Sequence, residues 1–379
     1  MDVLSAYKYL PQVYPADFIN SLGQSKDGES VLQSILTSTQ APARELWRQH
    51  LEACLAVADK HHLLEDSAFL SRLRCKELRE SQAAFSELGA ALYFEQAGAE
   101  VEFPPPSSTG NSFDFRVAAA GGKVVNAEVK AMLEGSLDEL HRRAMRCVRE
   151  CISRVNLPFD IVVSRVKPDL RFSRKDLRRF LEGQLGKVPN DGQQLPRHFF
   201  QLPRYINGSG FRATFWAARN PDAVHARFLT SSRGIWLSDD GARVVRDLKD
   251  ARSQLPRGKV ANLAIVDTTH TMWLHGKEVL SGLYGGDNAD RGQRPGEFVL
   301  TGRGSGFWGG GKNTRVSGVM LIRWLVLKPT VPQAYVLHNP WALVRIGRTF
   351  FPTNAVQFEF CPDTAAVSCD PAARRELWF

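Results

Sequence analysis

Three residues in two short segments of the chain could together carry out hydrolytic chemistry. Asp114 lies in SFDFRV, and Glu128 and Lys130 lie in KVVNAEVKA. Alternate side chains of an extended strand share a face, so Glu128 and Lys130 would project side by side, roughly 7 Å apart at their Cα atoms. Pairing of the two segments across their short turn would bring Asp114 beside Glu128. Two carboxylates that close repel each other unless a cation lies between them, and hard oxygen ligands suit Mg²⁺ or Mn²⁺.

Lys130 extends this chemistry. An ammonium group beside the two carboxylates could orient or help deprotonate a water, or neutralise charge that develops on a phosphate. The simpler alternative is an ordinary sheet in which the same Asp, Glu and Lys side chains form surface ion pairs.

The elements that must position these residues follow from the periodicity of the apolar side chains. A helix is predicted over residues 79–96, ending before Gly98, and strands are predicted over residues 101–103, 112–118 and 123–132. A second helix beginning near residue 137 and a strand over residues 159–166 are predicted next. Glu87 lies on the first helix among alanines and a phenylalanine, which is an unusual position for an acid unless it has a partner.

The spacing of the candidate residues resembles the D…(D/E)xK core of the PD-(D/E)xK nuclease superfamily. Thirteen residues separate Asp114 from Glu128-Val129-Lys130, and Phe113 stands in the place of the motif's proline. The resemblance implies an α/β fold with a restriction-endonuclease-like αβββαβ core and a mixed central sheet. It covers about residues 80–170, and a later helix and strand at 241–269 could complete the sheet. It also implies Mg²⁺ (or Mn²⁺) as the cofactor, Asp114, Glu128 and Glu87 as metal ligands, and Lys130 as a further catalytic residue.

Length and composition indicate a folded protein with more than one part. The chain has 379 residues, 43% of them hydrophobic, six cysteines and a formal net charge of +9. We expect a helical accessory region over residues 1–76 and a nuclease-like domain over residues 77–379 with a C-terminal extension of strands and loops. Residues 282–315 are Gly-rich and polar, so they are expected to form a long surface loop, and a short tail is expected after Pro340. No signal peptide, membrane-spanning segment or disulfide framework is apparent, so a cytoplasmic location is expected.

Basic residues concentrate after the proposed site. Between His141 and Phe180 there are twelve Lys or Arg residues and four acids, a local charge of +8. One-sided helical spacing and clustering predict that these residues contact nucleic-acid phosphates, unless they form a merely solvated helix face. A Gly-rich segment at 303–315 adds a phosphate-binding lysine and two aromatic residues for base stacking, with a plain surface linker as the alternative. The predicted nucleic-acid-binding residues are Arg142, Arg146, Arg149, Arg174, Lys175, Arg178 and Lys312.

Together these features predict a metal-dependent nuclease that hydrolyses phosphodiester bonds, with DNA as the expected substrate. The resemblance implies a role in bacterial restriction or antiviral defence, with a homodimer or a partner protein of a defence system left open. Two alternatives remain: a catalytically inactive nucleic-acid-binding module on a nuclease-like fold, and an RNA-directed nuclease.

Overall fold

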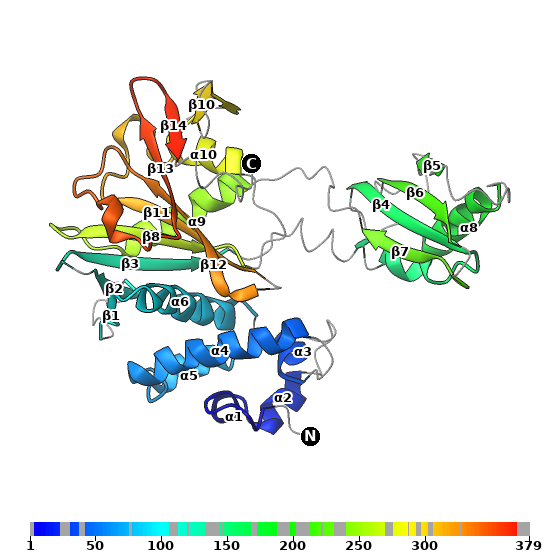
Figure 1. Ribbon diagram of the computed structural model, residues 1–379, viewed down its shortest axis with the longest axis horizontal. Coiled ribbons are helices and arrows are strands. Elements are labelled where there is room, and N and C mark those ends of the chain that lie inside the picture. Colours follow the sequence, from blue (N-terminus) through cyan, green and yellow to red (C-terminus); the bar gives the residue numbers. More distant parts are fainter. Residues whose placement is uncertain are drawn as a thin grey trace. The chain divides into compact units, whose positions relative to one another are not determined.

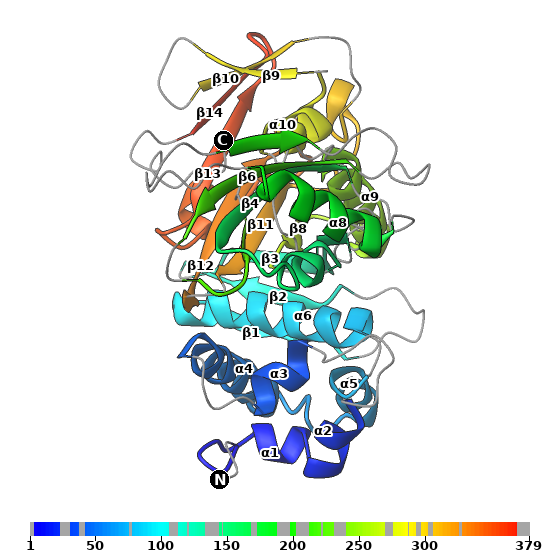
Figure 2. The same ribbon diagram turned by 90° about the vertical axis from the view of Figure 1, so that its right-hand side faces the viewer.

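The chain forms two compact units, which are drawn in Figures 1 and 2. Unit 1 comprises Met1–Leu133 and Asp239–Phe379, and unit 2 comprises Glu134–Ser238. The computed structural model describes residues 4–22, 31–37, 42–75, 78–105, 113–119, 121–132, 144–145, 147–167, 173–187, 198–201, 212–220, 223–230, 240–269, 276–286, 288–292, 297–301, 306–325 and 328–369. Unit 2 is an insertion within unit 1, and the expected boundary at residue 76 does not divide unit 1, because helices on both sides of it share a core with the sheet.

Unit 1 begins its sheet with the elements that carry the candidate site. Helix α6 (Leu78–Gln96) is followed by β1 (Glu100–Glu102), β2 (Phe115–Ala118) and β3 (Val124–Ala131). After the insertion come α9 (Asp240–Gln254) and β8 (Ala261–Asp267). Strand β2 pairs antiparallel with both β1 and β3, whereas β8 pairs parallel to β3. The chain order of these elements is therefore αβββαβ, with the last two supplied from beyond unit 2.

The sheet continues through the C-terminal part of the chain. Its strand order is β1-β2-β3-β8-β11-β12-β13-β14-β10-β9, ten strands within the described residues. The added elements are α10 (Gly276–Tyr284), β9 (Asn288–Arg291), β10 (Glu297–Thr301), β11 (Gly318–Leu325), β12 (Lys328–His338), β13 (Val356–Cys361) and β14 (Ala366–Cys369), with short 3₁₀ turns at Gly309–Gly311 and Arg348–Phe350. Parallel and antiparallel pairs occur together in this sheet, which confirms the predicted α/β class.

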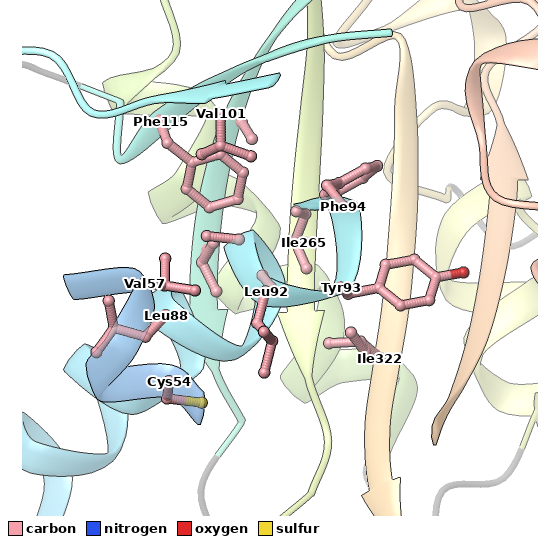
Figure 3. Packing of buried hydrophobic residues seen from close by; sticks show 14 of the residues in the cluster. Cys54, Val57, Leu88, Leu92, Tyr93, Phe94, Val101, Phe115, Ile265 and Ile322 are labelled. Carbon is pink, nitrogen blue, oxygen red and sulfur yellow. The ribbon is translucent and has the colours of Figure 1, made fainter. Parts of the chain in front are cut away.

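One face of this sheet is covered by helices of the first hundred residues. These are α1 (Leu10–Val13), α2 (Ala16–Leu22), α3 (Val31–Thr37), α4 (Pro42–Lys60) and α5 (Ser67–Leu73), together with α6. Figure 1 shows α6 lying along the sheet with α4 beyond it, and α6 contacts both β3 and α4. Leu88 of α6, Phe115 of β2 and Ile265 of β8 pack into one buried cluster with Cys54 of α4 (Figure 3). The predicted N-terminal helices therefore share a core with the sheet.

The opposite face of the sheet carries a second core. Val244 and Leu248 of α9 and Leu280 of α10 pack there against Ala264 and Val266 of β8. Alternation along β3 decides which residues face which side: Val125, Ala127 and Val129 belong to the first core, so Glu128 and Lys130 project toward the α9 side.

Unit 2 has its own sheet and core. Its described elements are β4 (Phe159–Lys167), α8 (Arg174–Leu185), β5 (His198–Gln201), β6 (Arg212–Arg219) and β7 (Arg227–Thr230), in the strand order β5-β6-β4-β7. Residues 147–152 are helical as well. The prediction that the helix from residue 137 and the strand at 159–166 complete the αβββαβ core is wrong, because that strand is β4 of the separate sheet and α9 and β8 fill those places. Its apolar residues pack within unit 2, where Phe159, Ile161 and Phe215 form a local core.

Two further sequence predictions are wrong. Residues 282–315 were expected to form a long surface loop, yet their described part contains β9 and β10 and contributes Phe298, Phe307 and Trp308 to the second core. A short tail was expected after Pro340, but β13 and β14 extend the sheet there. Glycine-rich connections and strands of only four to six residues hide these elements from periodicity. Within the described residues no helix is long and apolar enough to span a bilayer.

Candidate functional site

The candidate site lies where β2 begins beside the middle of β3. Asp114 directly precedes β2, and its backbone N–H donates to the carbonyl oxygen of Ala127 at 3.0 Å. Its side chain turns toward the next part of β3, where the Val129 N–H donates to Asp114 Oδ2 at 2.7 Å. Because Val129 lies between Glu128 and Lys130, this bond fixes the Asp114 carboxylate beside both residues. The predicted juxtaposition of Asp114 and Glu128 on neighbouring strands is thus present.

Glu128 and Lys130 form a direct ion pair on the α9 side of β3. The Lys130 Nζ donates to Glu128 Oε1 at 2.6 Å, and the side chains are 23% and 1% exposed, respectively. Gln254, the last residue of α9, lies against the same pair. With its amide nitrogen toward the carboxylate, Gln254 donates to Glu128 Oε1 at 2.5 Å and its oxygen accepts from Lys130 Nζ at 3.0 Å. The Gln254 side chain thereby forms hydrogen bonds with both the Glu128 carboxylate and the Lys130 ammonium group.

Glu87 has the partner that its apolar surroundings require. It is 7% exposed on α6, and Arg72 of α5 makes two hydrogen bonds to it, with Nη1 donating to Oε2 at 3.0 Å and Nη2 donating to Oε1. The preceding residue, Ser86, donates through Oγ to Asp267 Oδ2 at 2.6 Å. Since Asp267 ends β8, these two neighbours on α6 tie the helix to α5 on one side and to the sheet on the other.

The carboxylates of the site are held in an unfavourable electrostatic environment. Burial raises the pKa of Asp114 well above its usual range, and the nearby Glu87 and Glu128 carboxylates raise it further. Burial also raises the pKa of Glu128 to about 7, even though the adjacent Lys130 ammonium lowers it. Like-charged groups that water does not screen raise one another's pKa in this way. A cation at this position would relieve the repulsion.

The residues present fit a cation held by two carboxylates. Magnesium commonly binds one or two protein carboxylates and keeps waters or phosphate oxygens as its other ligands. Asp114 and Glu128 match that donor set once Lys130 releases Glu128 Oε1, whereas Arg72 engages both carboxylate oxygens of Glu87. Among the described residues no group of three His, Cys, Asp or Glu side chains is arranged to hold a metal ion. The structure thus brings together two of the three predicted ligands, Asp114 and Glu128. The third, Glu87, lies near enough for its carboxylate to raise the pKa of both.

The predicted nucleic-acid-binding residues fall into separate places. Arg142 and Arg146 lie outside the described residues. Arg149 is exposed on the helical segment of unit 2. Lys312 is exposed in unit 1, directly after the 3₁₀ turn at Gly309–Gly311.

Helix α8 of unit 2 presents the remaining predicted basic residues. Arg174, Lys175 and Arg178 are exposed, while the opposite face of α8 buries Leu177, Leu181 and Leu185. Arg174 pairs with Glu150 at 2.9 Å and Arg178 with Glu182 at 3.6 Å. Exposed ion pairs of this kind contribute little to stability in water.

The aromatic residues near Lys312 do not form a stacking surface. Phe307 is 3% exposed and Trp308 is fully buried, with the Trp308 ring 5.2 Å from that of Tyr284. The prediction that they stack on nucleic-acid bases is wrong, because they fill the second core beneath the sheet. Their place after glycines suggested an exposed loop, but the sequence could not show which apolar surface they complete.

No protein-family model, curated protein or solved structure matches this chain significantly, so its own geometry carries the functional argument. That geometry adds two site residues that sequence reasoning missed. Gln254 could have been suspected from its position at the end of a helix that precedes a buried strand. Arg72 carried no local signal, since only the packing of α5 on α6 brings it to Glu87.

Proposed function

We propose that this protein is a metal-dependent nuclease with a restriction-endonuclease-like core and that DNA is its substrate. The observation that carries the proposal is the bond from the Val129 N–H to Asp114, which holds two carboxylates and Lys130 together at one end of a β-hairpin. The element order α6-β1-β2-β3-α9-β8 agrees with the αβββαβ arrangement that the motif implies. The basic residues of α8 suit a phosphate backbone. A role in bacterial restriction or antiviral defence is part of this proposal.

Each site residue has a role that follows from its surroundings. Asp114 and Glu128 would hold Mg²⁺ or Mn²⁺, which when bound supplies Lewis-acid stabilisation of charge on a phosphodiester. Glu128 must lose its proton to act as a ligand, and its raised pKa sets the pH at which it does so. Lys130 can release Glu128 and place its ammonium group against the scissile phosphate. Gln254 remains hydrogen-bonded to the pair and limits how far either side chain turns.

A second function has a specific observation in its favour. Glu128 and Glu87 are both paired with cations of the chain itself, Lys130 and Arg72. Internal ion pairs of this kind suit a nucleic-acid-binding module that has lost catalysis. An RNA-directed nuclease differs from the main proposal only in its substrate.

Cleavage assays separate these functions. Purified full-length protein is incubated with plasmid, linear DNA and RNA, each with Mg²⁺, with Mn²⁺ and with EDTA. We expect cleavage of DNA that requires the metal, its abolition in Asp114→Asn and Glu128→Gln, and a loss of about 100-fold in Lys130→Ala. Glu102→Gln, an exposed acid on β1, serves as the matched control and should retain full activity.

Three outcomes would contradict the proposal or redirect it. Full activity in either carboxylate variant refutes the site assignment. Binding without cleavage of any substrate in either metal supports the inactive module. Cleavage confined to RNA supports the third function.

A further inference from the structure

A second concave site lies in unit 1, at the end of α9 and the start of β8. It is a pocket of about 290 Å³ lined by side chains from four parts of the chain. Arg252 comes from the last turn of α9, Arg257 from the connection to β8, and Arg315 from the segment before β11. None of these residues belongs to the carboxylate site.

The pocket carries concentrated positive charge. Of the described residues that line it, three are arginines and none is acidic. Burial lowers the pKa of Arg315, and the nearby guanidinium groups of Arg252 and Arg257 lower it further. Like charges are thus brought together here without a counter-charge from the lining residues. Arg252 and Arg257 are exposed, so water screens part of this repulsion, and an anion in the pocket would relieve the rest.

The arginines are positioned but not fully satisfied. Arg252 donates through Nη1 to Asn313 Oδ1 at 2.6 Å, and Arg315 donates through Nη2 to the carbonyl oxygen of Arg252. The Nε of Arg315 is buried and has no hydrogen-bond partner among the described residues. Buried donors are nearly always paired in folded proteins, so the Arg315 guanidinium retains unused hydrogen-bonding capacity beside the pocket. Guanidinium groups match the oxygens of a phosphate in geometry as well as in charge.

An apolar wall adjoins the arginines. Leu343 is 77% exposed and Val260 is 39% exposed, and both line the pocket together with Val344. Exposed branched aliphatic side chains beside a cluster of cations suit a ligand with an anionic end and a flat, less polar end. A nucleotide has this composition.

The pocket is connected to the carboxylate site through the sheet. Asn262, which also lines the pocket, is the register partner of Asn126 on β3, and Asn126 Nδ2 donates to Asn262 Oδ1 at 3.1 Å. Asn126 lies two residues before Glu128 on the same face of the strand, a separation of roughly 7 Å.

We propose that the pocket binds a phosphate group of a nucleotide, with Arg252, Arg257 and Arg315 around the phosphate and Val260 and Leu343 against the nucleoside. The phosphate can belong to a nucleic-acid strand or to a free nucleotide. The strand source rests on the proposed nuclease function, whereas affinity for a free nucleotide does not require cleavage.

Calorimetric titration in EDTA tests the pocket apart from catalysis. The full chain is titrated with adenosine 5′-monophosphate, with adenosine, and with a short single-stranded DNA oligonucleotide. We expect saturable binding of the monophosphate and none of adenosine. Arg252→Gln and Arg257→Gln should each weaken binding by about tenfold or more, the effect of one charge-assisted hydrogen bond. Arg246→Gln is the matched control, since Arg246 is exposed on the same helix, pairs with Asp247 and lies outside the pocket.

The outcomes separate the ligand source and the two proposals. Competition between the oligonucleotide and the monophosphate, with both weakened in Arg257→Gln, supports the pocket and identifies a strand as its ligand. Binding of the monophosphate without such competition supports it and identifies a free nucleotide. The pocket proposal is overturned if wild type binds neither the monophosphate nor the oligonucleotide at millimolar concentration. It is also overturned if Arg246→Gln loses as much affinity as Arg257→Gln. A protein that binds the monophosphate but cleaves no nucleic acid retains the pocket and refutes the nuclease.

Discussion

Replacing Glu128 with glutamine should stabilise the metal-free protein at neutral and alkaline pH. Glu128 is fully buried beside Asp114, and its ion pair with Lys130 does not offset the cost of burying its charge, since its pKa is raised to about 7. Glutamine keeps the size of the side chain and can still accept a hydrogen bond from Lys130. It removes the charge that the buried surroundings and the nearby Glu87 carboxylate disfavour.

The size and sign of the expected change in folding stability follow from the raised pKa of Glu128. The folded chain holds the Glu128 proton with a pKa of about 7, against an ordinary value of 4.5. Protonation of Glu128 therefore contributes stability that is fully present below about pH 4.5 and is lost as pH rises through about 7. At about 1.4 kcal/mol per pKa unit, wild type loses about 3 kcal/mol across this window. The pKa of about 7 already includes the effect of the Lys130 ion pair, which lowers it, so the variant should be more stable than wild type by about 3 kcal/mol above pH 7.

Urea unfolding at about pH 5 and about pH 8 in EDTA measures the effect. Glu128→Gln should unfold at higher urea than wild type at the higher pH and close to wild type at the lower pH, while Glu102→Gln follows wild type at both. Mg²⁺ at 100 times its Kd should restore about 2.7 kcal/mol to wild type at the higher pH and nothing to Glu128→Gln. If Glu128→Gln is less stable than wild type at both pH values, Glu128 acts chiefly as the ion partner of Lys130 and the reasoning fails.

Four further changes test other parts of the structure. Arg72→Met should cost about 3–5 kcal/mol in the free energy of unfolding, because it leaves a buried carboxylate without its cation, and denaturation at neutral pH measures this. Trp308→Ala should cost about 3–5 kcal/mol without weakening nucleic-acid binding, as a core residue does and a stacking residue does not. Gln254→Leu should raise the pH midpoint of Mg²⁺ binding by about one unit, since the ionised carboxylate loses a charge-assisted hydrogen bond; an unchanged midpoint removes Gln254 from the site. The double variant Lys175→Gln/Arg178→Gln should flatten the slope of log affinity against log salt by up to about 0.9 per lost phosphate contact on duplex DNA, and an identical slope would place binding elsewhere.

The local sequence pattern predicted which site residues lie together better than it predicted the order of the strands in the sheet. The face of β3 that carries Glu128 and the pairing with the Asp114 segment depend on alternation and a short turn, both of which a sequence displays. The partner strand of β3 could not be assigned in the same way, because β4 and β8 are both apolar runs in the sequence, each preceded by a helix. Only the packing of their apolar side chains distinguishes them: Phe159 of β4 completes a separate core, and Ile265 of β8 fills the space under α6.

The sequence also did not predict which residues pair with the buried charges. Glu87 was expected to need a partner, but the choice of Arg72 depends on how α5 crosses α6. The burial of Trp308 likewise depends on α10, where its ring lies 5.2 Å from that of Tyr284 and its backbone N–H donates to the carbonyl oxygen of Leu283. Long-range packing decides these contacts, and no local spacing records it.

The insertion of unit 2 between β3 and α9 also determines when the site can form during synthesis. Four residues of the site leave the ribosome before the insertion Glu134–Ser238: Glu87, Asp114, Glu128 and Lys130. Gln254 and β8 leave after the insertion. At about 5–20 residues per second, translation of the insertion takes roughly 5–20 s. Throughout that interval β3 lacks its parallel neighbour, so one edge of a strand rich in valine is unpaired. The nascent chain therefore has a period of exposure to misassembly, and the site cannot be complete until translation has passed β8.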